Sequence, residues 1–171
     1  MRALAALVLV GVVATLTACG GSSQNSRIIS VCRSTSGRAT GSPVTGSIVA
    51  LGRSPVLIRL DNRGNLNAGE PILGKTDYPG WLAIKTFFFT PPSFRGGFTV
   101  RVKGINGPSS AGIGTQPPGG KFTAHSGPAA LTKNGWREWP AFTWVKGPGC
   151  YEFAIKAGLL EERVVVAALS G

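Results

Sequence analysis

The sequence is poor in the residues that catalytic and metal sites use most. Its 171 residues include one histidine, His125, and only seven acidic residues against 18 basic ones. A catalytic triad would need His125 beside a nucleophile and an acid, for example Ser126 and Asp77. However, His125 lies in a Gly/Pro-rich stretch without the Gly-x-Ser-x-Gly pattern of a nucleophile elbow. The sequence therefore predicts no catalytic residue and no cofactor.

Paired carboxylates are the other arrangement that would indicate an enzyme, because glycosidases need two of them facing each other. Glu161 and Glu162 are adjacent, so on a strand their side chains would point to opposite faces. Glu138 and Glu152 could meet across strands, but in such a basic chain they suit ion pairs with lysine or arginine better. We predict that the protein is not an enzyme and keep an envelope hydrolase as an alternative.

Long apolar runs are also absent, since none reaches the about 20 residues that a membrane-spanning helix needs. The longest begins at Ala3, after the basic Arg2, and ends near Ala14. A basic residue, a short apolar core and small residues after it are the layout of an export signal.

The end of this signal resembles the lipobox of bacterial lipoproteins, with Leu16, Thr17 and Ala18 followed by Cys19. The resemblance implies cleavage before Cys19 and attachment of a diacylglyceryl group to its thiol. The next residues are rich in Gly, Ser, Gln and Asn, which is typical of a flexible tether. We therefore expect a signal peptide (1–18), a lipidated cysteine with tether (19–26) and one folded domain (27–171). The expected location is extracytoplasmic, anchored by lipid to a bacterial membrane.

The remaining two cysteines, Cys32 and Cys150, are expected to form a disulfide, because export permits one. A disulfide that closes a loop of ~100 residues stabilises the folded state by nearly 5 kcal/mol. Two cysteines and one distant histidine do not supply the four ligands of a zinc site, so no metal is predicted.

The folded domain is expected to be all-β, since 25 glycines and 12 prolines disfavour long helices. Asn134-Gly135 is a strong hairpin signal, while 70–80 and 107–120 suit long loops. Short apolar runs between turn residues predict an antiparallel sandwich with strands at 44–51, 55–60, 81–89, 98–105, 150–157 and 163–169.

The C-terminal segment resembles uncharacterised secreted bacterial immunoglobulin-like sandwich domains. In these domains a Pro-Gly-Cys element leads into an aromatic residue and a strand, then a Gly-bearing turn and a last apolar strand. The matching residues are Pro148, Gly149, Cys150, Tyr151, Phe153, Gly158, Val164 and Val166. The resemblance implies an immunoglobulin-like β-sandwich and implies no activity.

Trp136 is the best ligand-binding candidate in the sequence. On a strand it would face away from Trp139, so a solvent-facing Trp136 beside Lys133 or Arg137 could stack on a sugar ring. The alternative is that these tryptophans only pack the core and staple the hairpin.

Charge limits the class of partner. Removing residues 1–18 removes only Arg2 among the charged residues, which leaves 17 basic against seven acidic. Such a chain favours anionic surroundings, and export makes nucleic acid an unsuitable partner. We predict a non-catalytic envelope lipoprotein with a binding or support role. The alternatives are a carbohydrate or acidic wall-polymer binding module and an accessory protein that binds an envelope protein.

Overall fold

A computed structural model of the chain describes residues 20–33, 35, 38–42, 46–53, 55–60, 73–106, 110–125 and 129–170. The predicted signal peptide and Cys19 lie outside these residues. Within the described part, no helix is both long and apolar enough to cross a bilayer. Its elements are α1 (Gly20–Val31), β1 (Arg38–Ser42), β2 (Gly46–Ala50), β3 (Leu57–Leu60), β4 (Gly74–Lys75), β5 (Leu82–Thr90), β6 (Phe98–Asn106), β7 (Ala111–Gly114), β8 (Lys121–Ala124), β9 (Leu131–Lys133), β10 (Trp136–Val145), β11 (Gly149–Ala157) and β12 (Leu160–Ala168).

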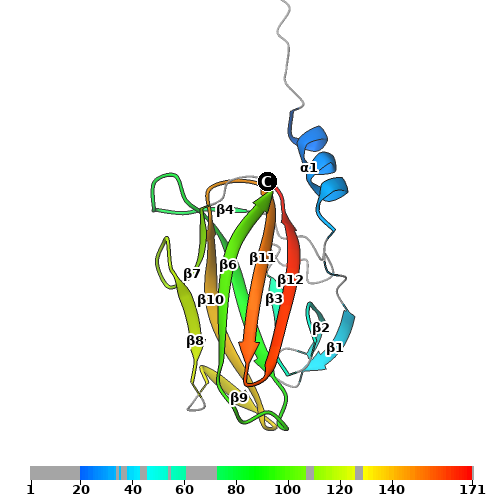
Figure 1. Cartoon of the computed structure of the whole chain (residues 1–171), viewed down its shortest axis with the longest axis vertical. Helices are drawn as coiled ribbons and strands as arrows, with labels where there is room; N and C mark the ends of the chain where they lie inside the picture. The colour runs from blue at the N-terminus through cyan, green and yellow to red at the C-terminus, as the bar shows by residue number, and fades with distance from the viewer. Residues whose placement is uncertain are drawn as a thin grey trace, which may run out of the picture.

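The strands form two facing antiparallel sheets (Figure 1). One has the order β3-β5-β10-β7, with β4 paired to β5 and β9 paired to β10. The other has the order β12-β11-β6-β8, and β1 and β2 form a separate two-stranded ribbon. This arrangement confirms the predicted antiparallel β-sandwich.

The core lies between the two sheets and follows the alternation of the sequence. In β6, Phe98, Val100 and Val102 are buried, while the alternating Arg101 and Lys103 are exposed. The ring of Phe98 meets Trp139 of the opposite sheet edge-to-face, with centroids 5.2 Å apart. Burying one such side chain stabilises the fold by about 1.5–3 kcal/mol.

The predicted hairpin is present between β9 and β10. Asn134 and Gly135 both have positive φ angles, of 50° and 77°. A two-residue turn with both angles positive matches the twist of the flanking strands, which is why Asn-Gly favours it.

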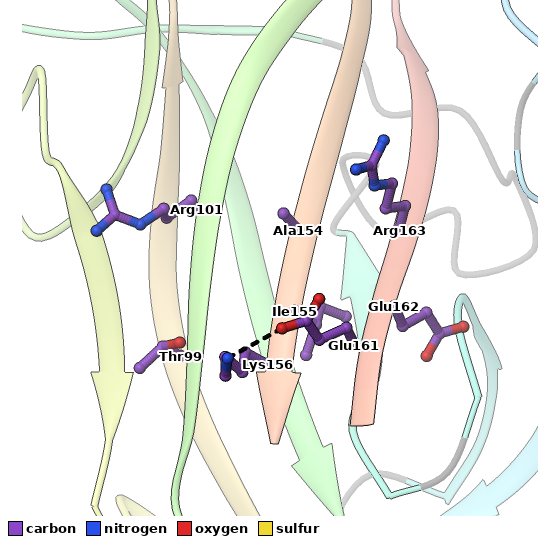
Figure 2. A pocket seen from close by; sticks show the side chains of 8 residues that line it. All are labelled: Thr99, Arg101, Ala154, Ile155, Lys156, Glu161, Glu162 and Arg163. Atoms are coloured by element: carbon purple, nitrogen blue, oxygen red, sulfur yellow. Dashed lines mark hydrogen bonds and ion pairs between the residues drawn. The ribbon is translucent and has the colours of Figure 1, made fainter. Parts of the chain in front are cut away.

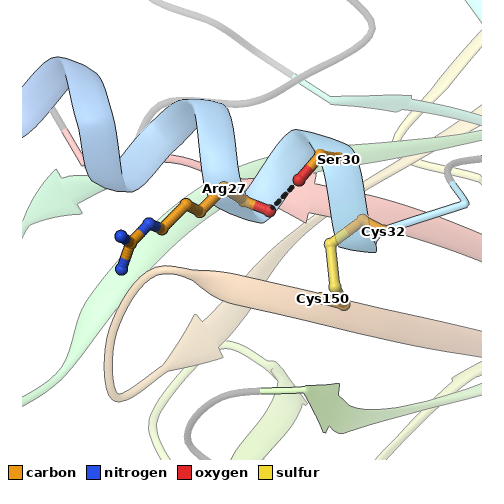
Figure 3. The surroundings of a disulfide bond; sticks show 4 residues. All are labelled: Arg27, Ser30, Cys32 and Cys150. Carbon is orange, nitrogen blue, oxygen red and sulfur yellow. Dashed lines mark hydrogen bonds between the residues drawn. A yellow bond between two sulfur atoms is a disulfide. The ribbon is translucent and has the colours of Figure 1, made fainter.

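The N-terminal segment differs from its prediction. Instead of a flexible tether up to residue 26, helix α1 begins at Gly20 and runs to Val31. The helix is held at its end by the Cys32–Cys150 disulfide, which confirms the predicted pair (Figure 3). Ile28 packs beside this disulfide, together with Ala167 and Leu169 of the chain's last segment. The bond therefore fixes a helix to the outer side of one sheet and does not join the two sheets.

Two of the predicted loops contain strands. The short β4 lies in the first, and β7 lies in the second. Strand β7 pairs with β10 where Gly112 lies opposite Trp144. A Cβ at Gly112 would collide with the carbonyl oxygen of Pro118. The glycine that lowers strand propensity is therefore needed here, because the returning backbone approaches so closely.

Candidate functional site

Trp136 and Lys133 are paired on either side of the Asn134-Gly135 turn of the β9–β10 hairpin, on the outward side of their sheet. Lys133 is exposed, but the Trp136 ring is half-buried. It packs on a small cluster outside the main core, formed by Ala50, Leu57, Phe87 and Phe89. Much of the ring area is therefore used for packing, as the alternative interpretation of the tryptophans expects.

Arg137 does not share this surface. Its side chain is only 7% exposed and points to the inner side of the sheet. Its Nη2 donates to the carbonyl oxygens of Phe94 and Gly96, at 2.7 and 3.2 Å, and its guanidinium lies 5.0 Å from the Trp139 ring. Burial, and to a smaller degree the like charge of Arg95, lowers the pKa of Arg137. The predicted pairing of Trp136 with Arg137 is wrong, because neighbours on a strand face opposite ways.

The two carboxylates of the hydrolase alternative lie on opposite faces of the sandwich. Glu138 is 3% exposed on the outer side of the β10 sheet, where burial raises its pKa and Arg59 and Lys85 offset part of the rise. Glu152 lies on the outer side of the other sheet, 3.1 Å from Lys103 Nζ. With the core between them, they cannot act together on one bond.

The two triad candidates that the structure describes lie on separate elements. His125 is exposed at the end of β8, and Asp77 is exposed in the turn after β4. Ser126 lies outside the described residues. Among the residues that are described, no group of three His, Cys, Asp or Glu side chains is close enough to hold a metal.

The most distinctive charged surface is the outward side of the β12-β11-β6-β8 sheet, here called the basic face. Its cations are Arg101, Lys103, Lys121, Lys156 and Arg163. The strand register aligns three of them in one row. Arg163 of β12 is paired with Ala154 of β11, Ala154 with Arg101 of β6, and Arg101 with Lys121 of β8. With strands about 4.8 Å apart, the row spans ~14 Å.

The acidic residues of the basic face are already paired. Glu152 contacts Lys103 at 3.1 Å and Arg163 at 3.8 Å, and Glu161 contacts Lys156 at 2.9 Å. Within the described part of the chain, Arg101 and Lys121 have no ion-pair partner. The face therefore keeps an uncompensated positive charge on β6 and β8.

A shallow hollow of about 260 Å³ lies on this face (Figure 2). Arg101 and Arg163 lie on either side of β11, and the short side chain of Ala154 leaves the space between them. Glu162 also lines the hollow, and its carboxylate accepts the backbone N–H of Arg53 at 2.9 Å. Guanidinium groups in this position can donate paired hydrogen bonds to a phosphate or carboxylate.

Comparisons with known proteins add little to this geometry. No protein-family model matches the chain, and no curated protein matches it in sequence. Among solved structures, it is similar to the GAE domain of GGA2p from Saccharomyces cerevisiae, with 11% identity and a TM-score of 0.30. The similarity covers 69% of this chain and 91% of that one. A likeness this distant says nothing about function.

Sequence reasoning missed the basic face because its residues are far apart in the chain. Arg101, Lys121 and Arg163 come from three strands, and none lies in a motif. One signal was present: Arg101 and Lys103 occupy the outward positions of the most regular alternating strand. The row itself requires the pairing register of four strands.

Proposed function

We propose that this protein is a non-catalytic binding domain, held outside a bacterial membrane by a lipid on Cys19. The lipobox-like residues 16–19 and the export-signal layout before them support the anchor. The Cys32–Cys150 disulfide is compatible with it, because disulfides persist outside the cytoplasm.

Its ligand is an anionic polymer of the cell envelope, bound across the basic face. The row of Arg163, Arg101 and Lys121 over four paired strands is the observation that carries this proposal. The hollow of about 260 Å³ is smaller than the ~300–1,000 Å³ typical of small-molecule pockets. An exposed, shallow surface with charges at regular spacing suits repeated phosphates or carboxylates better than a single small ligand.

The binding site is tested with a pair of double variants that each remove one arginine and one lysine. Arg101→Gln with Lys121→Gln removes the unpaired charges of the basic face. Arg95→Gln with Lys133→Gln removes two exposed cations elsewhere. Each exposed ion pair contributes up to about 1 kcal/mol, so the first variant should bind a purified acidic wall polymer roughly tenfold more weakly. The second should bind like the wild type.

The outcomes separate the alternatives. If the Lys133 variant loses affinity instead, the surface around Trp136 is the binding site and the basic face is not. Equal losses in both variants would mean that only net charge matters, which would contradict a defined site.

The anchor is tested separately in a bacterial host. A Cys19→Ala variant should lose labelling by a radioactive fatty acid and keep its signal peptide, because the modified cysteine directs cleavage. Unchanged labelling would show that Cys19 is not the lipid attachment site.

A further inference from the structure

One end of the sandwich combines lysines with aromatic side chains. The turn between β4 and β5 and the turn between β10 and β11 both lie there (Figure 1). Lys75, Tyr78, Trp81 and Lys146 line a shallow pocket of about 300 Å³ between these turns. The Nζ of Lys146 lies 4.1 Å from the Trp81 ring, a cation–π contact.

The aromatic rings of this end are fixed by the turn. Thr76 Oγ1 donates to the carbonyl of Trp81 at 2.9 Å and accepts the N–H of Tyr78 at 3.2 Å. The N–H of Trp81 donates to the carbonyl of Tyr78 at 3.0 Å. Tyr78 also meets the buried Trp144 edge-to-face, with ring centroids 5.3 Å apart. Tyr78 nevertheless stays 39% exposed, so the end presents an ordered amphipathic ring to solvent.

The charge of this end is positive. Lys75 and Lys146 are exposed, and within the described residues neither has an ion-pair partner. Asp77 is the acidic residue of the turn and reduces, without cancelling, the charge of the two lysines. Helix α1 adds the exposed Arg27.

The polypeptide reaches its anchor point from the same end. Helix α1 extends past this end of the sandwich toward its first residue, Gly20 (Figure 1). Its 12 residues rise ~18 Å, so a lipid on Cys19 holds the end within about that distance of the headgroups. Exposed apolar side chains, Val31 and Ile105, lie near the base of the helix and are 59% and 43% exposed.

We propose that this end, made of Lys75, Tyr78, Trp81 and Lys146, docks on the anionic headgroups of the membrane that holds the anchor. The inference rests on the proposed lipidation of Cys19, which fixes the end that faces the bilayer. Tyrosine and tryptophan favour the membrane–water interface, and lysines near an anionic leaflet are attracted to it. Because the anchor makes the contact intramolecular, a weak attraction is enough to orient the domain.

Docking by this end sets the direction of the basic face. The long strands run away from the docked end (Figure 1). The outer side of the β12-β11-β6-β8 sheet is therefore roughly perpendicular to the membrane plane. The row of Arg163, Arg101 and Lys121 then points sideways along the envelope, where a wall polymer can reach it.

The test uses a chain that starts at Gly20, which keeps every described element and lacks the lipid. Sedimentation measures its binding to vesicles of neutral lipid with about a third phosphatidylglycerol. Each lysine near an anionic surface raises partitioning about fivefold, so Lys75→Gln with Lys146→Gln should weaken binding roughly 25-fold. The basic-face variant, Arg101→Gln with Lys121→Gln, is the matched control and should keep most of the binding.

Three results would overturn the proposal. They are an end variant that binds vesicles like the wild type, equal losses in both variants, and loss of polymer binding instead of vesicle binding in the end variant. Excess glycerol phosphate distinguishes a bilayer from a free phosphate, since only a site for the isolated headgroup would be saturated by it. The fatty-acid labelling of Cys19 is independent of these results, so failure of the docking leaves the anchor intact.

Discussion

Removal of the Cys32–Cys150 disulfide gives the sharpest stability prediction. The bond closes a sequence separation of 118 residues, and the loop-entropy relation assigns about 5 kcal/mol to a loop of that length. Native disulfides measured in small exported domains contribute ~2–5 kcal/mol. We expect the Cys32→Ala, Cys150→Ala variant to lose 3–5 kcal/mol of unfolding free energy in urea, within that ~2–5 kcal/mol range.

The structure also predicts which element loses its protection from hydrogen exchange first. Helix α1 is held to the sheet through the disulfide and the packing of Ile28 against Ala167 and Leu169. Its first two turns are mostly polar, so little other burial holds it in place. In hydrogen exchange, the α1 amides of the variant should exchange freely while those of β6, β10 and β11 remain protected. Reduction of the wild type by a thiol serves as the control and should give the same pattern.

Two results would refute this reasoning. A loss below about 1 kcal/mol would mean that the bond adds little beyond the packing around it. Simultaneous loss of protection in α1 and in the strands, under conditions where the variant is still folded, would mean that the helix is an integral part of the sandwich.

Two further predictions concern buried polar groups in the sandwich. Tyr151 is fully buried, and its hydroxyl donates to the Gly147 carbonyl. Tyr151→Phe should therefore lower the free energy of unfolding in urea by about 1–2 kcal/mol. No measurable loss would disprove the contribution of that hydrogen bond. Burial raises the pKa of Glu138, so the native state holds this proton more tightly than the unfolded state and stability falls as pH rises through the native pKa. Glu138→Gln should therefore lose less stability than the wild type as pH rises above about 4.3, the ordinary glutamate pKa, and an unchanged pH profile would contradict the assigned cause.

The sheets were largely predictable because their signals are local. The alternation in 98–105 predicts β6, and Asn134-Gly135 predicts the hairpin, since each depends on neighbouring residues alone. The cysteine pair was predictable from the count of cysteines and the expected compartment. These features need no knowledge of distant contacts.

The rest depends on contacts between distant segments. Helix α1 has weak intrinsic propensity over its Gly/Ser/Asn-rich first half and is fixed by a cysteine bonded 118 residues later. Strand β7 was not predicted, because Gly112 lowers the strand propensity of its segment. The structure requires this glycine, since the backbone of Pro118 approaches it too closely for a Cβ. Arg137 was predicted to lie at the surface beside a solvent-facing Trp136. Its partners are instead the carbonyls of a loop 41 and 43 residues earlier.

The candidate site was the least predictable part. Its row of cations exists only once β12, β11, β6 and β8 are paired in register, and a shift of one residue would turn Arg101 into the core. Tryptophan is a residue type that often binds ligands, which made Trp136 a candidate. Its packing against the Phe87 and Phe89 cluster became visible only in three dimensions.

The most direct test of the proposed function is to observe which residues respond to an anionic polymer. Backbone amide NMR signals of the ¹⁵N-labelled chain from Gly20 onward would be followed during titration with a purified acidic wall polymer at physiological salt. We predict shifts centred on Arg101, Lys121 and Arg163 that disappear in the Arg101→Gln, Lys121→Gln variant. Shifts centred on the Trp136 hairpin, or spread evenly over all exposed lysines and arginines, would contradict a binding site on the basic face.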